Sequence, residues 1–195
     1  MIRAYAVRLA AVAAAACVAA SLALAAPVPG VKPAQPQPAA DKLQPGLSVN
    51  YTYMMFSDVS EVPKAGKGKP GPALANLDHR TDSGNVLTAT ASMGVGAQIN
   101  GFIKLDKPGT YTFELISNDG VKWTLGGAMV YENPGIHGDT PSPPIEVEVK
   151  EPGWYAFAID YFQRKGTSAL RLSWKPPGGQ VLVVVPPEAF ASLKP

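Results

Sequence analysis

The residue types with the clearest binding chemistry are a carboxamide and a carboxylate side by side, Asn118 and Asp119, followed by Gly120. Oxygen atoms of such side chains bind hard cations, and they accept hydrogen bonds from sugar hydroxyls. Asn and Asp also bond to their own backbone in tight turns, so the same residues would serve a purely structural turn. The pattern therefore predicts either a cation or sugar site or a structural turn.

A strand is expected immediately before this turn. Apolar residues alternate with Thr and Glu over residues 111–115, which is typical of a half-buried strand. Pro108-Gly109 precedes the alternation and Asn118-Asp119-Gly120 follows it, and both are turn-forming sequences. The strand would therefore place the two polar side chains at one edge of a sheet.

Other polar residues extend the candidate site. His137 lies in a Gly/Pro loop that begins near Asn133, where it would either bond a sugar hydroxyl or cap the loop. Asp160 lies near the end of another expected strand, where it would support a ligand loop or face solvent. Gln163 and Arg164 lie in the next turn, at the expected rim of the site.

Enzyme chemistry finds little support in the sequence. The chain has two histidines and one cysteine, and it lacks a Gly-x-Ser-x-Gly elbow, zinc-ligand spacing and a phosphate-binding loop. Trp123, Trp154 and Trp174 could form sugar-stacking platforms. Because each lies in strand-like alternation, burial in the core is the favoured interpretation. We therefore expect a protein that is not an enzyme.

Residues 1–26 are predicted to be a signal peptide. Arg3 and Arg8 precede an Ala/Val/Leu run, and Ala23-Leu24-Ala25 has the small-x-small pattern of a cleavage site. A transmembrane anchor and a lipidated Cys17 are the alternatives. The sequence thus predicts a secreted or periplasmic protein, which meets a membrane only through an uncleaved or lipidated signal.

The charge balance argues against nucleic acid as a partner. The chain carries 17 basic and 15 acidic side chains, and removal of residues 1–26 takes away two arginines and no acidic residue. The remaining net charge is near zero, whereas nucleic-acid binders carry a basic surplus or stripe. The lysines at 64–69 lie in a Pro/Gly loop and are interpreted as a solvated surface.

The chain divides into three parts. After the signal peptide, residues 27–45 are rich in proline and are predicted to be a disordered linker with no fold of its own. Residues 46–192 are predicted to form one all-β domain, an antiparallel sandwich or barrel, because short strands alternate with Gly/Pro turns. Strands are expected at 47–53, 86–90, 98–105, 111–115, 121–125, 128–131, 145–149, 154–162, 170–174 and 181–185, with a long loop at 60–72.

Several motifs, taken in order, resemble the PA-fourteen domain, the β-sandwich module of anthrax protective antigen, yeast flocculins, other adhesins and some glycosidases. The resemblance covers nearly all of residues 46–190 and implies an antiparallel β-sandwich. The motifs are Gly101-Phe102-Ile103-Lys104, Pro108 to Phe113, Ser117-Asn118-Asp119-Gly120, Asn133 to Gly138, Gly153-Trp154-Tyr155, Asp160 to Gln163, and Leu170 to Trp174.

The resemblance also implies carbohydrate recognition, in several members through a calcium ion held by two adjacent aspartates. Here Asn118 and Asp119 occupy those positions, so they are the candidate metal ligands. One negative charge is missing, and Pro134 replaces a second carboxylate found in a related group of members. Because calcium affinity depends on ligand charge, both departures weaken the expected calcium site.

The leading hypothesis is an exported, non-catalytic module that binds a carbohydrate or cell-surface glycan. A structural or protein-interaction domain of the cell envelope is the alternative, and an accessory module of a glycosidase system is a third reading. The candidate ligand-binding residues are Asn118, Asp119, Gly120, Asn133, His137, Asp160, Gln163 and Arg164.

Overall fold

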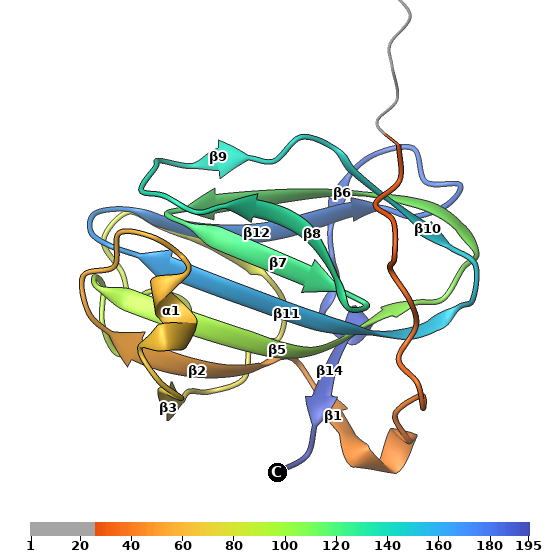
Figure 1. The fold of residues 1–195 in the computed structure, drawn as a ribbon, viewed down its shortest axis with the longest axis horizontal. Helices are drawn as coiled ribbons and strands as arrows, with labels where there is room; N and C mark the ends of the chain where they lie inside the picture. The colour runs from red at the N-terminus through yellow and green to blue at the C-terminus, as the bar shows by residue number, and fades with distance from the viewer. Residues whose placement is uncertain (1–25) are drawn as a thin grey trace, which may run out of the picture.

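The computed structural model describes residues 26–195, which fold into two antiparallel β-sheets packed face to face (Figure 1). The antiparallel β-sandwich expected from the sequence is confirmed. The expected signal peptide, apart from Ala26, and Cys17 within it lie outside the described residues. Among residues 26–195, no helix has the length and apolar character needed to cross a membrane.

The larger sheet has eight strands. Its main path runs β1-β14-β5-β11-β7-β8, with β2 beside β5 and β3 beside β2. β5 and β11 pair along their whole length, from Leu105 opposite Gly153 to Val95 opposite Gln163. The strands are β1 (Leu43–Pro45), β2 (Ser48–Tyr53), β3 (Lys69–Pro70), β5 (Val95–Leu105), β7 (Val121–Leu125), β8 (Ala128–Asn133), β11 (Gly153–Gln163) and β14 (Phe190–Leu193).

The smaller sheet has six strands. Its main path runs β10-β6-β12-β13, with β4 beside β12 and β9 beside β6. The strands are β4 (Asp78–Thr81), β6 (Gly109–Asn118), β9 (Thr140–Pro141), β10 (Ile145–Val149), β12 (Ser168–Lys175) and β13 (Val183–Val184). Helical structure in the described chain is limited to α1 (Glu61–Lys64) and two 3-10 turns, η1 (Ala40–Lys42) and η2 (Pro187–Ala189).

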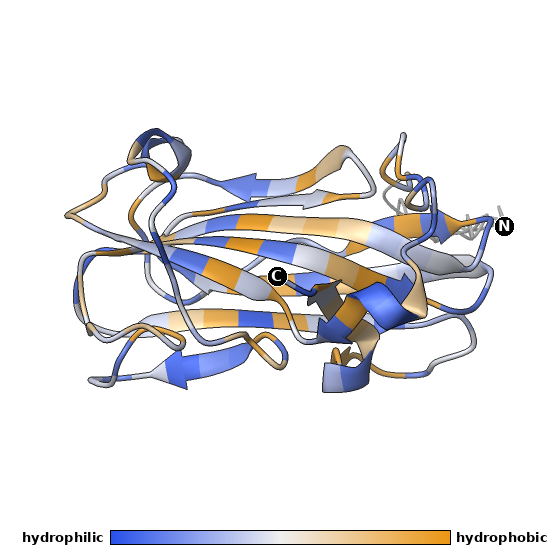
Figure 2. Cartoon of the chain, turned by 90° about the horizontal axis from the view of Figure 1, so that it is seen from below, coloured by the Kyte–Doolittle hydropathy of each residue, from blue (hydrophilic) through white to orange (hydrophobic). Residues whose placement is uncertain are grey.

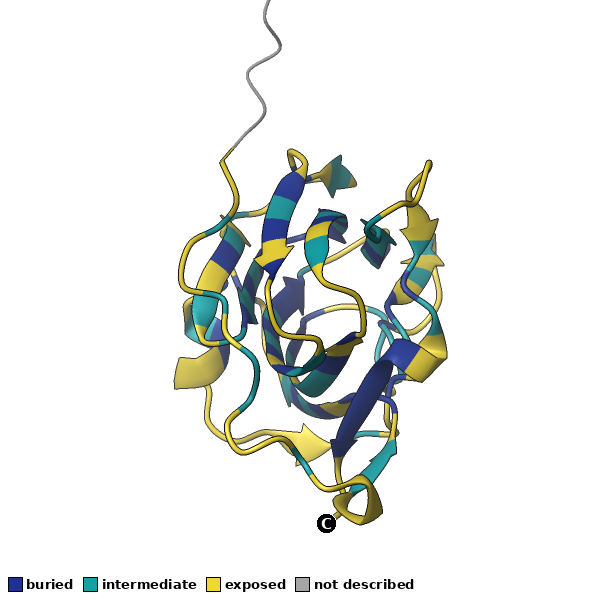
Figure 3. Ribbon diagram, turned by 90° about the vertical axis from the view of Figure 1, so that its right-hand side faces the viewer, coloured by how far each residue is buried: buried dark blue, intermediate teal, exposed yellow. Residues whose placement is uncertain are grey.

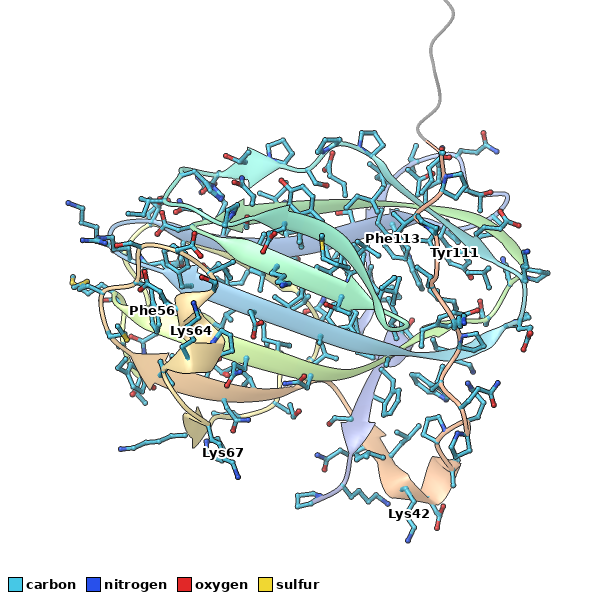
Figure 4. All side chains as sticks on the ribbon, in the orientation of Figure 1. Lys42, Phe56, Lys64, Lys67, Tyr111 and Phe113 are labelled. Carbon is cyan, nitrogen blue, oxygen red and sulfur yellow. The ribbon has the colours of Figure 1, made fainter. Side chains whose placement is uncertain are left out.

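Aromatic side chains join the two sheets. Hydrophobic and hydrophilic residues alternate along the strands (Figure 2), and so do buried and more exposed ones (Figure 3). Since successive side chains of a strand point to opposite faces, the buried set faces the space between the sheets. Trp123 of the larger sheet meets Phe113 of the smaller sheet edge to face, with ring centroids 5.3 Å apart. Tyr111, labelled with Phe113 in Figure 4, is also fully buried and lies against Trp174 of the same sheet at 5.6 Å. The contact between Trp123 and Phe113 therefore links the two sheets, and Tyr111 and Trp174 extend the aromatic packing within the smaller one.

Of the three tryptophans expected in the core, Trp123 is fully buried and Trp174 packs against the core from its edge. Trp154 is different, because it lies on the outer face of the larger sheet and is half-buried. It alternates in phase with Ala156 and Asp160, whereas Tyr155 and Phe157 point inward. The expectation of a core residue is therefore wrong for Trp154.

The segment 27–45, predicted to be a disordered linker, is instead part of the domain. The backbone N–H of Val28 donates to the carbonyl of Glu146 (2.8 Å), that of Lys32 to Gly126 (3.1 Å) and that of Ala34 to Trp154 (2.8 Å). Strand β1 then pairs with β14. The prediction was wrong because the non-proline residues keep free N–H groups that find carbonyls at the rim of the sandwich. We call residues 26–42 the strap; it descends the right-hand side of Figure 1.

Three local expectations also need correction. The loop expected at 60–72 contains α1 and β3. Residues 86–90, expected to be a strand, form tight turns in which Val86 donates to the carbonyl of Ala91 and Leu87 has a φ of 53°. In the run 181–185, pairing is confined to β13, and Val181 is 66% exposed. Apolar runs alone did not distinguish strands from buried turns or exposed loops.

Candidate functional site

Three connections meet at one end of the sandwich, on the left in Figure 1. They are the turn between β6 and β7 (residues 118–120), the connection between β8 and β9 (134–139) and the turn between β11 and β12 (164–167). We call these residues the loop end. The structure thus brings together most of the residues that the sequence predicted for the site.

Asp119 joins all three connections. Its Oδ1 accepts the backbone N–H of His137 (3.0 Å), and its Oδ2 accepts the backbone N–H of Arg164 (2.8 Å). Its own backbone N–H donates to the carbonyl of Phe162 (3.1 Å). The residue is only 3% exposed. A buried carboxylate with two backbone donors holds loops in place, so Asp119 links the three connections of the loop end by hydrogen bonds.

Asn118 makes a second set of ties. Its Nδ2 donates to Asp139 Oδ1 (2.9 Å) and to Thr167 Oγ1 (2.8 Å), while its carbonyl accepts the Tyr161 hydroxyl (2.6 Å). The peptide bond between Asn118 and Asp119 is cis. Burial raises the pKa of the Tyr161 hydroxyl well above its usual value, and the nearby Asp119 and Asp139 carboxylates add to that rise. Tyr161 therefore stays a neutral donor.

Asp139 and Arg80 belong to the site although sequence reasoning missed both. Arg80 Nε donates to Asp139 Oδ2 over 2.8 Å, and the Asp139 side chain is 32% exposed. The hydrogen bond from Asn118 lowers the pKa of Asp139, Arg80 lowers it further, and partial burial opposes them. Asp139 follows His137-Gly138 directly, so its position in the predicted loop was a usable signal. Arg80 comes from β4, whose place beside β12 no local pattern revealed.

His137, Asn133 and Gly120 shape the middle of the loop end. His137 Nδ1 lies 2.8 Å from the carbonyl oxygen of Gly138, whereas its Nε2 is buried and has no partner among the described residues. Asn133 ends β8 opposite Val121. A Cβ on Gly120 would lie 2.4 Å from Phe162 Cε1 and 2.5 Å from the carbonyl oxygen of Pro134. Only glycine fits this close approach of chains.

Arg164 and Gln163 hold the turn after β11. The Arg164 guanidinium donates to the carbonyl of Phe56 (2.9 Å) and to Ser57 Oγ (2.6 Å), which ties in a fourth segment. Phe56, labelled in Figure 4, packs on Phe162 at 6.0 Å. Gln163 is fully buried, and its Nε2 donates to the carbonyl of Gly166 (3.2 Å). Gln163 therefore supports the turn from below and does not reach the rim.

Asp160 is not brought to the loop end. It lies on the outer face of the larger sheet, opposite Gln98 on one neighbouring strand and Lys122 on the other. Burial raises the pKa of Asp160, and the positive charge of Lys122 lowers it in part. The predicted link between Asp160 and a ligand loop is thus absent from the described contacts.

The donor set as arranged does not fit a calcium ion. Calcium takes six to eight oxygen ligands, with several carboxylates in tight sites. Both Asp119 oxygens already accept backbone N–H groups, and the neighbouring Asn118 brings no negative charge. In residues 26–195 no group of three or more His, Cys, Asp or Glu side chains is placed to hold a metal. Calcium at Asn118 and Asp119 stays a prediction that this geometry does not favour.

The sequence of this β-sandwich matches a known family. The family model for the PA14 domain matches residues 44–185. This is the PA-fourteen domain that the sequence motifs resemble. The chain belongs to the PA14 domain family. A search of the curated proteins finds no match.

Solved structures carry the same fold as this PA14 domain. The PA14 domain of the MpAFP antifreeze protein is 19% identical, with a TM-score of 0.65, over 82% of this chain and 96% of that one. The PA14 sugar-binding domain from an RTX adhesin is 19% identical, with a TM-score of 0.59, over 77% and 99%. The A domain of epithelial adhesin 9 from Candida glabrata, solved with Galβ1-3GlcNAc, is 13% identical, with a TM-score of 0.65, over 86% and 96%.

Proposed function

We propose that this PA14 domain is an exported, non-catalytic module that binds carbohydrate at its loop end. The RTX adhesin domain is described as sugar-binding, and the epithelial adhesin was solved with a disaccharide. These likenesses support the class of ligand by analogy only. A shared fold does not by itself imply a shared function. The site must therefore be argued from the side chains of this chain.

One observation carries the proposal: the side chains of Asn118 and Asp119 form hydrogen bonds that hold two neighbouring connections in place. Asn118 bonds to Asp139 and Thr167, while Asp119 bonds to the backbone of His137 and Arg164. A rim of polar groups is thereby held on a rigid scaffold, the arrangement on which specific binding loops depend.

The rim itself offers the contacts for sugar hydroxyls. The Asp139 carboxylate accepts hydrogen bonds, and the hydroxyl of the exposed residue Thr167 donates and accepts them. Asp119, which the sequence predicted as a ligand-binding residue, becomes a positioning residue in this proposal. No chemical step is assigned to any residue.

Export is part of the proposal and rests on residues 1–26. Their positive start, apolar run and Ala23-Leu24-Ala25 pattern support cleavage near Ala26. Sequencing the N-terminus of protein recovered from the periplasm or the medium tests this. A chain beginning at Ala26 or Pro27 is expected, whereas an intact Met1 in a cytoplasmic fraction would contradict export.

A protein-binding function is the second candidate, because an apolar patch adjoins the loop end. Tyr53, Met54, Met55 and Met93 are each about half exposed. The Met54 N–H donates to the carbonyl of Gly94, and the Gly94 N–H donates to the carbonyl of Arg164, so the patch borders the site. Exposed methionine-rich surfaces adapt to apolar partners.

A glycan array probed with the purified protein separates the two functions. We expect hits that are lost when Asp139→Ala or Thr167→Ala alters the rim, and that remain in Asp41→Ala, a control at an exposed aspartate far from the site. Running each array in calcium and in chelator tests the calcium prediction, and the geometry leads us to expect no difference.

Hits that survive both rim variants would contradict a site at the loop end. A folded sample with no hits in either buffer would instead favour the protein-binding function. In that case, truncation of Met54 and Met55 is the next variant to compare.

A further inference from the structure

We propose a second carbohydrate site in this protein, a groove centred on Trp154 on the outer face of the larger sheet. Trp154 lies near the start of β11, whereas Gln163 at the other end of that strand borders the loop end. At a rise of about 3.3 Å per residue, the two positions are roughly 30 Å apart. The groove is thus separate from the loop end and does not depend on it.

The first half of this groove is a hollow beside the Trp154 side chain. Its volume is about 800 Å³, and its wall comes from five separate segments of the chain. Lys104 lies opposite Trp154 in register, so the two residues share one face of the sheet. We call this the Trp154 hollow; β1 and the C-terminal segment close it with Leu43, Gln44, Glu188 and Phe190.

A second hollow continues the first along the same face. It has a volume of about 400 Å³ and is lined by Phe102, Ala156 and Ala158, with Ser48 and Asn100 at its polar side. Phe102 lies opposite Ala156 and two residues before Lys104, so the hollows follow one another along β5 and β11. Small alanine side chains line the second hollow. The two hollows share no lining residue, and we take them as successive parts of the proposed groove.

The chemistry of the groove suits a neutral oligosaccharide. Indole and phenyl rings offer flat apolar surfaces to the C–H faces of sugar rings, and ligand sites are commonly apolar with a few polar groups. Lys104 donates hydrogen bonds and Glu188 accepts them, and both are exposed. Sugar hydroxyls do both. The opposite charges cancel, so neither an anionic nor a cationic ligand is favoured.

The strap holds the platform in position. Gln37 Oε1 accepts the backbone N–H of Trp154 (2.7 Å), and Gln37 Nε2 donates to its carbonyl (2.9 Å). Ala34 donates to the same carbonyl (2.8 Å). Both backbone polar groups of Trp154 are thus bonded to the strap before any ligand binds. This preorganisation of the backbone lowers the entropic cost of binding.

The chain has three tryptophans, so a ¹⁵N–¹H spectrum of the purified protein has three indole peaks. Trp154→Phe assigns the Trp154 peak by its disappearance. We titrate with cellotriose, chitotriose, maltotriose, mannotriose and Galβ1-4GlcNAc. At least one sugar is expected to move the Trp154 peak while the buried Trp123 peak stays in place.

Variants then test the contacts. Their affinity for the sugar is measured from the shifts of the backbone amide peaks around Lys104. Trp154→Ala is expected to weaken binding by about tenfold or more, because the stacking surface is lost. Glu188→Gln keeps the platform and is expected to weaken binding by a few-fold, whereas Glu151→Gln outside the groove leaves it unchanged. Asp139→Ala at the loop end also leaves it unchanged, which separates this result from the loop-end proposal.

No movement of the Trp154 peak with any of the five sugars, in a protein with a folded spectrum, overturns the proposal. Movement that a proline-rich peptide produces and no sugar produces also overturns it, because the groove would then be a peptide site. An unchanged affinity in both Trp154→Ala and Glu188→Gln would place the sugar elsewhere and overturn it as well.

Discussion

The backbone N–H of Arg164 donates to the carboxylate of Asp119 over 2.8 Å, although the two residues are 45 positions apart in the chain. The other carboxylate oxygen receives the N–H of His137 from a third connection. One side chain therefore couples three separate turns at the loop end. A change at Asp119 should affect all of them together.

Asp119→Ala is expected to lower the free energy of unfolding by about 2–4 kcal/mol, because two part-buried N–H groups lose their acceptor. Urea unfolding followed by tryptophan fluorescence measures the change. Asp119→Asn keeps one acceptor oxygen and should cost less. Equal stability of Asp119→Ala and the unaltered protein would show that these bonds do not hold the loops.

Gly120→Ala is expected to destabilise the protein by about 1–3 kcal/mol, because overpacking forces neighbours to shift. The new Cβ would meet Phe162 and the backbone of Pro134. Gly135→Ala is the matched control in the next connection, since nothing lies within 4 Å of its Cβ position. Thermal unfolding of the two variants should differ clearly, and similar melting temperatures would count against the close approach at Gly120.

The pKa of Asp139 lies below its ordinary value of 3.8, chiefly because Asn118 donates a hydrogen bond to the carboxylate. The folded protein therefore holds this proton less tightly than the unfolded chain. The resulting stabilisation is present above pH 3.8 and is lost as the pH falls through the folded-state pKa. Unfolding experiments from about pH 5 to pH 2 should show this loss. Asp139→Asn should flatten that part of the profile, and an unchanged slope would refute the assignment.

Asp160 should change the pH dependence of folding stability in the opposite direction. Burial raises its pKa above 3.8, so its ionised form is disfavoured in the folded protein. The cost is present at neutral pH and is relieved as the pH falls through the raised pKa. Asp160→Asn is expected to stabilise the protein modestly at pH 7 and to have less effect at low pH. NMR titration of the Asp160 carboxyl gives the pKa directly, and a value below 3.8 would contradict this prediction.

Gln37→Ala is expected to cost about 1–2 kcal/mol of stability, because the side chain bonds to both backbone groups of Trp154. Gln35→Ala is the control, two residues away on the same exposed strap. Amide hydrogen exchange at the start of β11 should accelerate in the first variant alone. Equal exchange in both would mean that the strap does not fix Trp154.

Much of the fold was predictable because alternation is a local signal. The strands β6, β10 and β12 were expected from residues 111–115, 145–149 and 170–174, and all three are present. The strap was misread because its partners, such as Glu146 and Trp154, lie more than a hundred residues away. A proline-rich composition shows that a segment cannot form a regular sheet interior, but it does not show that the segment stays free.

The site was predictable in part for the same reason. Asn118, Asp119 and His137 occur in turn-like sequence, and the structure brings them together. Asp160 was expected either to support a ligand loop or to face solvent, and its alternation with Ile159 and Tyr161 already indicates an outward side chain. Trp154 shares that outward phase. Arg80 needed the pairing of β4 with β12, which is a long-range contact.

The pairing of β1 with β14 has a consequence for the architecture of larger proteins. Leu43 lies opposite Leu193, and the N–H of Lys194 donates to the carbonyl of Lys42 over 2.9 Å. The paired sheets thus begin and end at adjacent points. The strap leads away from that point to the carbonyl of Glu146, so the two ends of the described domain lie apart (Figure 1). A host protein that carried this domain in a surface loop would have to span the strap as well as the paired ends.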